Sequence, residues 1–145
     1  MARRKKPDAA ASPAEDTPEE AADALRLRFR GEVIELVSTA EYPFQVLQTE
    51  EYETWADSIS DIRTSTRIDV NVDKMQRGLF GDWKIVGDGV FEMRLDFGAG
   101  YRIYYARHGA FVVVLLAGGD KSDQRKAIAD AKRLWKGMKN EITQV

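Results

Sequence analysis

The 145-residue sequence contains no cysteine and a single histidine, His108. Without cysteine the chain has no disulfides and no thiolate metal sites, and one histidine cannot build the multi-histidine clusters of common metal centres. The most apolar run, residues 111–117, is far too short to cross a bilayer. We therefore expect no metal centre and no membrane partner, and we expect the protein to be cytoplasmic.

The sequence also lacks the glycine-rich loops that bind nucleotides. The segment GGDKS has Asp120 where a phosphate loop has glycine, and Leu115 where that loop begins with glycine. The segment FGAG has no third glycine and precedes a strand rather than a helix. We therefore expect no nucleotide cofactor. Lys121 stays a candidate anion contact because it lies at a predicted helix start, although a plain surface lysine is an equal alternative.

Charge is distributed unevenly along the chain. The net charge is −2, but residues 83–145 carry 11 Lys and Arg against 7 Asp and Glu, which leaves +4 there and −6 in residues 1–82. The acidic total argues against a protein that coats nucleic acid without regard to sequence. The positive C-terminal part still allows a local basic surface.

Composition divides the chain into three parts. Residues 1–24 hold almost no large apolar side chain, so they cannot bury enough surface to offset the entropy of ordering, and we expect disorder. In residues 25–42, apolar residues alternate with arginines, which predicts an extra hairpin or a charged edge strand. Residues 43–145 have the pattern of one compact domain.

Helical periodicity predicts three helices in residues 43–145. Thr49 is a suitable N-cap for the first helix. Apolar residues recur at helical spacing as far as Leu79 in the second helix, which ends at Gly78 and Gly81. Ser122 is the expected cap of the last helix.

Apolar alternation and turn residues predict the strands. The expected strands are 43–49, 83–87, 90–97, 101–107 and 110–119. The order is thus a strand, two helices, three or four antiparallel strands and a final helix. This order predicts an α+β domain, in which the helical hairpin and the C-terminal helix pack on one face of a twisted antiparallel sheet.

Strict alternation in the segment VFEMRLDF distinguishes the two faces of the predicted sheet. Its apolar residues point toward the helices, so Arg94 lies on the opposite, open face, where Arg102 and Tyr104 of the next strand join it. Two guanidinium groups and a phenol suit a phosphodiester, because the guanidinium forks bind phosphate oxygens and the ring stacks on a base. The alternative is that both arginines only pair with Glu92 and Asp96 across the strands.

Two segments, GDWKIVGDGVFEMRLDFGAGYR and LLAGGDKSDQRKAI, resemble the RelE/ParE superfamily of toxins from type II toxin–antitoxin systems, and within it the HigB-like addiction module killer proteins. With the helical hairpin that precedes them, the resemblance runs from about Phe44 to Met138. It implies a RelE-like fold, in which a twisted antiparallel sheet packs against helices. Residues 1–42 lie outside the resemblance.

Relatives of the RelE and HigB type are ribosome-dependent mRNA endoribonucleases, so the resemblance implies that activity here. We expect a metal-free reaction, in which the RNA 2′-hydroxyl attacks the adjacent phosphorus. In the family, activity depends on basic residues on the concave face of the sheet. The corresponding catalytic residues are Arg102, Arg94 and Lys121, and the predicted substrate-binding residues are Lys84, Tyr104 and Tyr101.

The resemblance also implies partners. A cognate helix-turn-helix antitoxin is expected in every case, and an endoribonuclease would also bind the ribosome and mRNA. Two departures leave alternatives open, because RelE has a lysine where Glu92 stands and a tyrosine in the region that reads SDQRKAI here. The alternatives are a ParE-like, non-enzymatic inhibitor of DNA gyrase and an inactive antitoxin-binding module.

Overall fold

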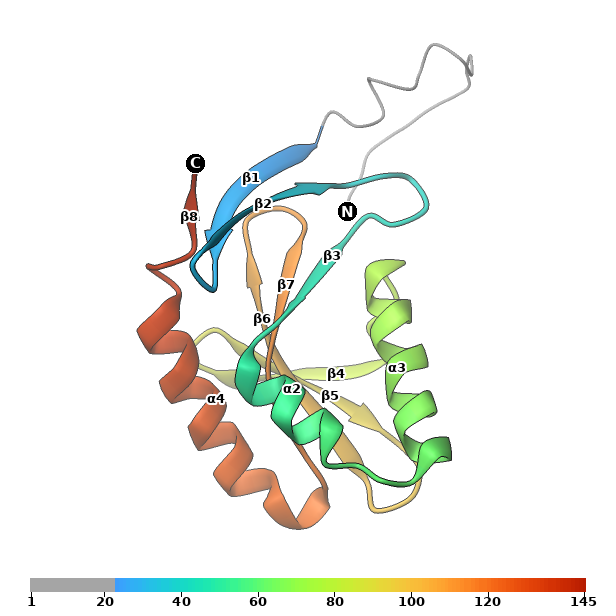
Figure 1. Ribbon diagram of the computed structural model, residues 1–145. Coiled ribbons are helices and arrows are strands. Elements are labelled where there is room, and N and C mark those ends of the chain that lie inside the picture. The colour runs from blue at the N-terminus through green and yellow to red at the C-terminus, as the bar shows by residue number, and fades with distance from the viewer. Residues whose placement is uncertain (1–22) are drawn as a thin grey trace.

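The computed structural model describes residues 23–145 of the chain (Figure 1). Within this range, eight strands and three α-helices form two sheets and two buried clusters. The prediction of disorder concerns residues 1–24, and 1–22 lie outside the described residues. No helix between residues 23 and 145 is long and apolar enough to span a membrane.

The larger sheet has five strands in the order β3-β7-β6-β5-β4. Its strands are β3 (Gln45–Gln48), β4 (Asp82–Gly87), β5 (Val90–Leu95), β6 (Tyr101–His108) and β7 (Val112–Gly119). The smaller sheet has the order β2-β1-β8, with β1 (Ala24–Phe29), β2 (Glu32–Val37) and β8 (Thr143–Gln144). The helices are α2 (Glu50–Asp57), α3 (Ile62–Gln76) and α4 (Gln124–Met138), and the 3-10 turn η1 (Lys121–Asp123) precedes α4. The α+β class is confirmed.

The prediction of a wholly antiparallel sheet is wrong at one edge. Strands β4 to β7 pair antiparallel, but β3 pairs with β7 in parallel, with Val46 opposite Val113. Two helices and three strands separate β3 from β7, and a connection of that length permits the parallel pairing that a short turn forbids. Apolar periodicity shows which residues are buried, but it does not show the direction of the partner strand.

Helices cover both faces of the larger sheet, whereas the sequence predicted one covered face (Figure 1). On one face Met75 of α3 belongs to the same buried cluster as Ile103 of β6. On the other face Trp135 of α4 belongs to the same buried cluster as Tyr104 of β6. Strands β6 and β7 bury the side chains on both of their faces, as strands between two layers of helices do, so both faces of the sheet are covered.

Strands β1 and β2 form a hairpin, within the segment where the sequence left a hairpin and an edge strand open. At its turn Arg30 and Gly31 both have positive φ, 53° and 81°, as a primed hairpin turn requires. Leu27 and Phe29 of β1 are buried in the same cluster as residues of α4 and β7. The hairpin therefore shares one hydrophobic core with residues 43–145 rather than lying apart from them.

The helix ends match the predicted ones only in part. Thr49 caps α2 as predicted, because its side chain accepts a hydrogen bond from the Tyr52 backbone N–H. Leu79 was predicted in the buried stripe of α3, but the helix ends before it and Leu79 is 58% exposed. Ser122 does not cap the last helix: the N-cap of α4 is Asp123, whose side chain makes no capping hydrogen bond, and Asp120 caps η1 by accepting hydrogen bonds from the Ser122 hydroxyl and backbone N–H.

Gly118 of β7 allows α2 to approach the sheet closely, because a Cβ added at Gly118 would overlap the indole ring of Trp55. Gly118→Ala should therefore lower the free energy of unfolding by about 3 kcal/mol, as overpacking does in a rigid core. Gly137→Ala is the matched control: nothing lies within 4 Å of its added Cβ, and alanine favours α4 by up to about 1 kcal/mol. Equilibrium denaturation measures both changes, and equal stabilities would contradict the close packing of α2.

Candidate functional site

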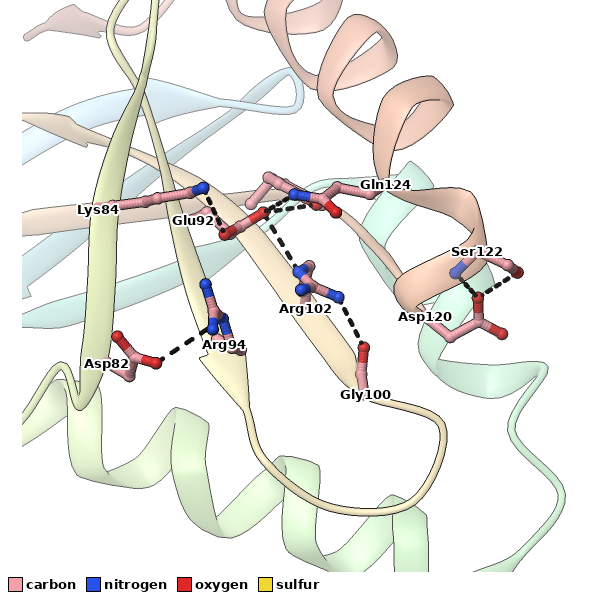
Figure 2. Close-up of polar contacts among 10 residues, drawn as sticks. Asp82, Lys84, Glu92, Arg94, Gly100, Arg102, Asp120, Ser122 and Gln124 are labelled. Atoms are coloured by element: carbon pink, nitrogen blue, oxygen red, sulfur yellow. Dashed lines mark hydrogen bonds and ion pairs between the residues drawn. The ribbon is translucent and has the colours of Figure 1, made fainter.

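The strand register places polar side chains of β4, β5 and β6 in two rows across one face of the larger sheet (Figure 2). The first row is Asp82, Arg94 and Arg102, and the second row, two residues along each strand, is Lys84, Glu92 and Tyr104. In β7 the rows end at Gly119 and Ala117. A Cβ at Gly119 would lie only 3.0 Å from the Cβ of Asp123, so this glycine admits η1 and the start of α4.

Glu92 lies at the centre of this cluster, with only 1% of its side chain exposed. Its Oε2 accepts hydrogen bonds from the Tyr104 hydroxyl at 2.9 Å and from Nε2 of Gln124 at 3.3 Å, and it lies 3.4 Å from Nε of Arg102 (Figure 2). Its Oε1 lies 3.8 Å from Nζ of Lys84. A buried carboxylate requires such partners, because burial disfavours its charged form unless cations and donors compensate.

Arg102 is held in one orientation by two neighbours. Its side chain is 8% exposed, and Nη1 donates a hydrogen bond to the carbonyl oxygen of Gly100 at 3.1 Å. Nε is buried and has no hydrogen-bond partner among residues 23–145, although the Glu92 carboxylate is close. A buried unsatisfied donor costs roughly 1–3 kcal/mol, and such groups are rare in folded proteins.

Arg94 lies directly opposite Arg102 on the neighbouring strand. Like charges in opposed positions destabilise a sheet, so each guanidinium needs a counter-charge. Nε of Arg94 lies 3.7 Å from Oδ2 of Asp82, and Arg102 is close to Glu92. The predicted pairing was therefore correct for Glu92 and wrong for Asp96, whose place Asp82 of β4 takes. The two rows hold three cationic and two anionic side chains, which leaves one positive charge without a counter-charge.

Lys121 lies beside the turn between β5 and β6. Its backbone N–H donates to the carbonyl oxygen of Ala99 at 3.3 Å, and a Cβ added at Gly100 would lie 3.4 Å from the Cβ of Lys121. Gly100 also accepts the hydrogen bond from Arg102, so Lys121 borders the cluster. The side chains of Lys121 and Lys84 are both exposed. The structure thus brings the four predicted basic residues to one region of the sheet.

Neither predicted tyrosine lies on an open face. Tyr104 is 1% exposed within the cluster that α4 covers, so it is not available to stack on a base. Burial, followed by the hydrogen bond to Glu92, raises the pKa of the Tyr104 phenol. Tyr101 lies on the opposite face, with ring centroids 5.6 Å from Phe97 and 6.5 Å from Trp55. The expected place of Tyr104 on an open face is therefore wrong, because α4 covers it, and Tyr101 lies on the face opposite the arginines; substrate binding by either tyrosine stays a prediction.

The sequence did not predict a role for Gln124, and it predicted Glu92 only as an ion-pair partner of the arginines rather than as the centre of the cluster. Gln124 begins α4, 32 positions from Glu92, and no local pattern connects the two residues. A signal does exist for Glu92, because its period-two spacing from Arg94 puts both side chains on one face. The sequence does not show that α4 encloses the Glu92 end of this face and leaves Arg94 exposed.

Comparisons with known proteins place the chain in a family. No known protein-family model matches it. An uncharacterized protein from Haemophilus influenzae is 41% identical over 90 residues, which make up 62% of this chain and 91% of the relative. The chain belongs to the same family as that protein. Since function resides in a site rather than in a fold, the polar cluster carries the functional argument.

The central position of Glu92 predicts a large stability effect. Glu92→Ala leaves Arg102 buried without a counter-charge, so the free energy of unfolding should fall by about 3–5 kcal/mol. Lys84→Ala is the matched control, because this side chain is 53% exposed and surface ion pairs contribute about 0–1 kcal/mol. Urea denaturation compares the two variants. Losses of similar size would show that Glu92 does not hold the cluster together.

The buried tyrosines predict a delayed alkaline titration. Burial raises the pKa of Tyr52 and Tyr104, and it raises the pKa of Tyr105 to about 12. Because the fold keeps these phenols protonated above their ordinary pKa of about 10, their stabilisation is complete below pH 10 and is lost as the pH rises further. Tyrosinate absorbance should therefore show a fraction that ionises only on unfolding. Tyr104→Phe should reduce this fraction, and an unchanged fraction would place Tyr104 outside the core.

Proposed function

We propose that the protein is a RelE/ParE superfamily toxin of a type II toxin–antitoxin system and that it cleaves mRNA on the ribosome. The observation that carries the proposal is the opposed pair Arg94 and Arg102, with Lys84 and Lys121 beside it. The cationic side chains of the two rows outnumber the carboxylates, and guanidinium groups match phosphate oxygens in both charge and geometry.

The order of elements supports a RelE-like fold for residues 44–138. A helical hairpin, four antiparallel strands and a C-terminal helix follow one another in the order that the resemblance implies. Two features differ from the fold that the sequence predicted. Strand β3 joins the sheet in parallel, and α4 lies on the face opposite α3.

In the proposed reaction, the 2′-hydroxyl of mRNA attacks the adjacent phosphorus in line. The bond from phosphorus to the 5′ oxygen of the next nucleotide breaks; the attacking hydroxyl loses a proton and the leaving oxygen gains one. The products are a 2′,3′-cyclic phosphate and a 5′-hydroxyl. Arg94 and Arg102 stabilise the negative charge on the non-bridging oxygens, Lys121 contacts the phosphate, and the ribosome orients the RNA.

Glu92 is a positioning residue in this scheme. Its carboxylate is buried, so it acts on the substrate only through the cations that it holds, Arg102 and Lys84. Tyr104 and Gln124 in turn fix the carboxylate by donating hydrogen bonds to Oε2. Arg94 and Lys121, which are exposed, are the groups that a phosphate reaches without displacing a buried contact.

The burial of Arg102 favours a second candidate, the ParE-like inhibitor of DNA gyrase. Because Glu92 already balances the Arg102 charge in a site that is 8% exposed, a phosphate has to compete with an existing ion pair. An inhibitor that works by binding alone needs no phosphate site. In that case Arg94 and Lys121 belong to a protein interface.

Translation in a purified bacterial system, followed by mapping of mRNA 5′ ends, tests the proposal. The protein should create new 5′ ends inside translated codons. Arg94→Ala and Lys121→Ala should each slow cleavage by roughly a hundredfold, the usual effect of removing one electrostatic donor, and both should fold because the side chains are exposed. Arg26→Ala, which removes an exposed arginine of β1, is the matched control and should cleave like wild type.

A gyrase supercoiling assay run in parallel separates the candidates. Intact mRNA together with inhibited supercoiling would replace the endoribonuclease with the gyrase inhibitor. If neither translation nor supercoiling changes, the protein is an inactive antitoxin-binding module. Arg102→Lys adds a further check, since it keeps a positive charge beside Glu92 but removes the guanidinium fork. Unimpaired cleavage by this variant would show that the reaction does not use the guanidinium fork of Arg102.

A further inference from the structure

Strand β4 is an uncovered edge of the larger sheet. It comes last in the order β3-β7-β6-β5-β4, so one of its two edges has no strand partner within the part of the chain that the structure describes. Residues 82–85 of this strand are all exposed. An unpaired strand edge offers a row of backbone donors and acceptors to another chain.

The exposed side chains of this edge include large apolar ones. Trp83 and Ile85 lie on the α3 side of the sheet, opposite Met93 and Phe91 of β5, yet they are 51% and 67% exposed. The rings of Trp83 and Phe91 meet edge to face with centroids 5.9 Å apart, which holds the indole in place. Exposed apolar side chains beside an unpaired edge indicate an interaction surface.

We propose that β4 pairs antiparallel with β4 of a second copy of this chain, so that the two Trp83 residues face each other across a twofold axis. The charge pattern argues for this occupant. In this register Asp82 of each copy lies opposite Lys84 of the other, so opposite charges meet twice. Pairing of this kind joins the two five-stranded sheets into one of ten strands.

Neighbouring registers bring like charges together. A twofold axis at Asp82 would oppose two aspartates, and an axis at Lys84 would oppose two lysines. An axis at Ile85 would oppose Asp82 and Asp88. Like charges in directly opposed positions destabilise a strand pair. The edge is therefore complementary to itself in the register centred on Trp83, as the symmetric interface of a homodimer requires.

The dimer preserves the polar face of each copy. A twofold axis perpendicular to the sheet keeps equivalent faces on the same side. The faces that carry Arg94 in the two copies therefore form one continuous surface. On the α3 side, the two Trp83 side chains lie opposite each other, and Ile85 of each copy lies opposite Gly81 of the other. The proposal stands on the edge strand alone and does not depend on the proposed RNA cleavage.

Sedimentation equilibrium of the full chain tests the association. The wild type should sediment with twice its mass of 16.4 kDa in the micromolar range. Trp83→Lys should sediment as a folded monomer, because it places two like charges at the axis. Ile62→Lys, at a 77% exposed position of α3, is the matched control and should remain a dimer. A monomeric wild type would overturn the proposal, and so would an unchanged dimer of Trp83→Lys.

Single cysteines test the register, because the chain has none of its own. Trp83→Cys places two thiols directly opposite each other, with Cβ atoms about 4.5–5.5 Å apart, from which a small shift permits a disulfide. Ile85→Cys faces Gly81 in this register, so its two thiols lie about 13 Å apart along the strands. Oxidation should link Trp83→Cys into a covalent dimer and leave Ile85→Cys unlinked. Equal linkage of both variants, or none in Trp83→Cys, would refute the register.

Discussion

The buried carboxylate of Glu92 constrains the middle of the molecule. A charge that has left water is tolerated only where other groups replace its hydration, and these groups come from three separate elements. Lys84 belongs to β4, Arg102 and Tyr104 to β6, and Gln124 to α4. Satisfying one carboxylate therefore fixes the register of three strands and the start of the last helix. An apolar residue of similar volume would avoid the desolvation penalty, so stability alone does not account for a carboxylate here.

The two sides of the larger sheet differ in polarity. The α3 side is packed with aliphatic and aromatic side chains, and Trp83 and Ile85 leave apolar surface exposed at its free edge, on β4. The α4 side is apolar near Val90 and Ala106 and becomes polar toward Arg94 and Arg102. This gradient lets one helix serve two purposes, because the middle of α4 closes the core while its first residue reaches the charged cluster. A charged face and an exposed apolar edge thus coexist in a small domain.

Features encoded by near neighbours were predictable from the sequence. Thr49 caps α2 because its side chain needs only the backbone N–H three residues on, and β7 is buried because it is apolar throughout. The outcomes that escaped prediction depend on contacts between distant segments. Parallel pairing of β3, the face chosen by α4 and the contact from Gln124 to Glu92 leave no local trace. Tyr104 shows the limit of sequence-based prediction most clearly. Alternation predicted correctly that it shares a face with Arg94, but a tyrosine can lie either on a solvent-exposed surface or in a core where its hydroxyl has a hydrogen-bond partner.

The pairing of β1 with β8 has a consequence for when the fold can form. This contact joins residue 27 with residue 144. Strand β3 likewise pairs with β7, from which two helices and three strands separate it in the sequence. Such non-local closures are slow compared with the formation of the helical hairpin, because loop entropy is lost before the contacts compensate for it. The larger sheet can therefore close only when β7 is available to β3, and the smaller sheet can take its third strand only when residues 143–144 are available to β1.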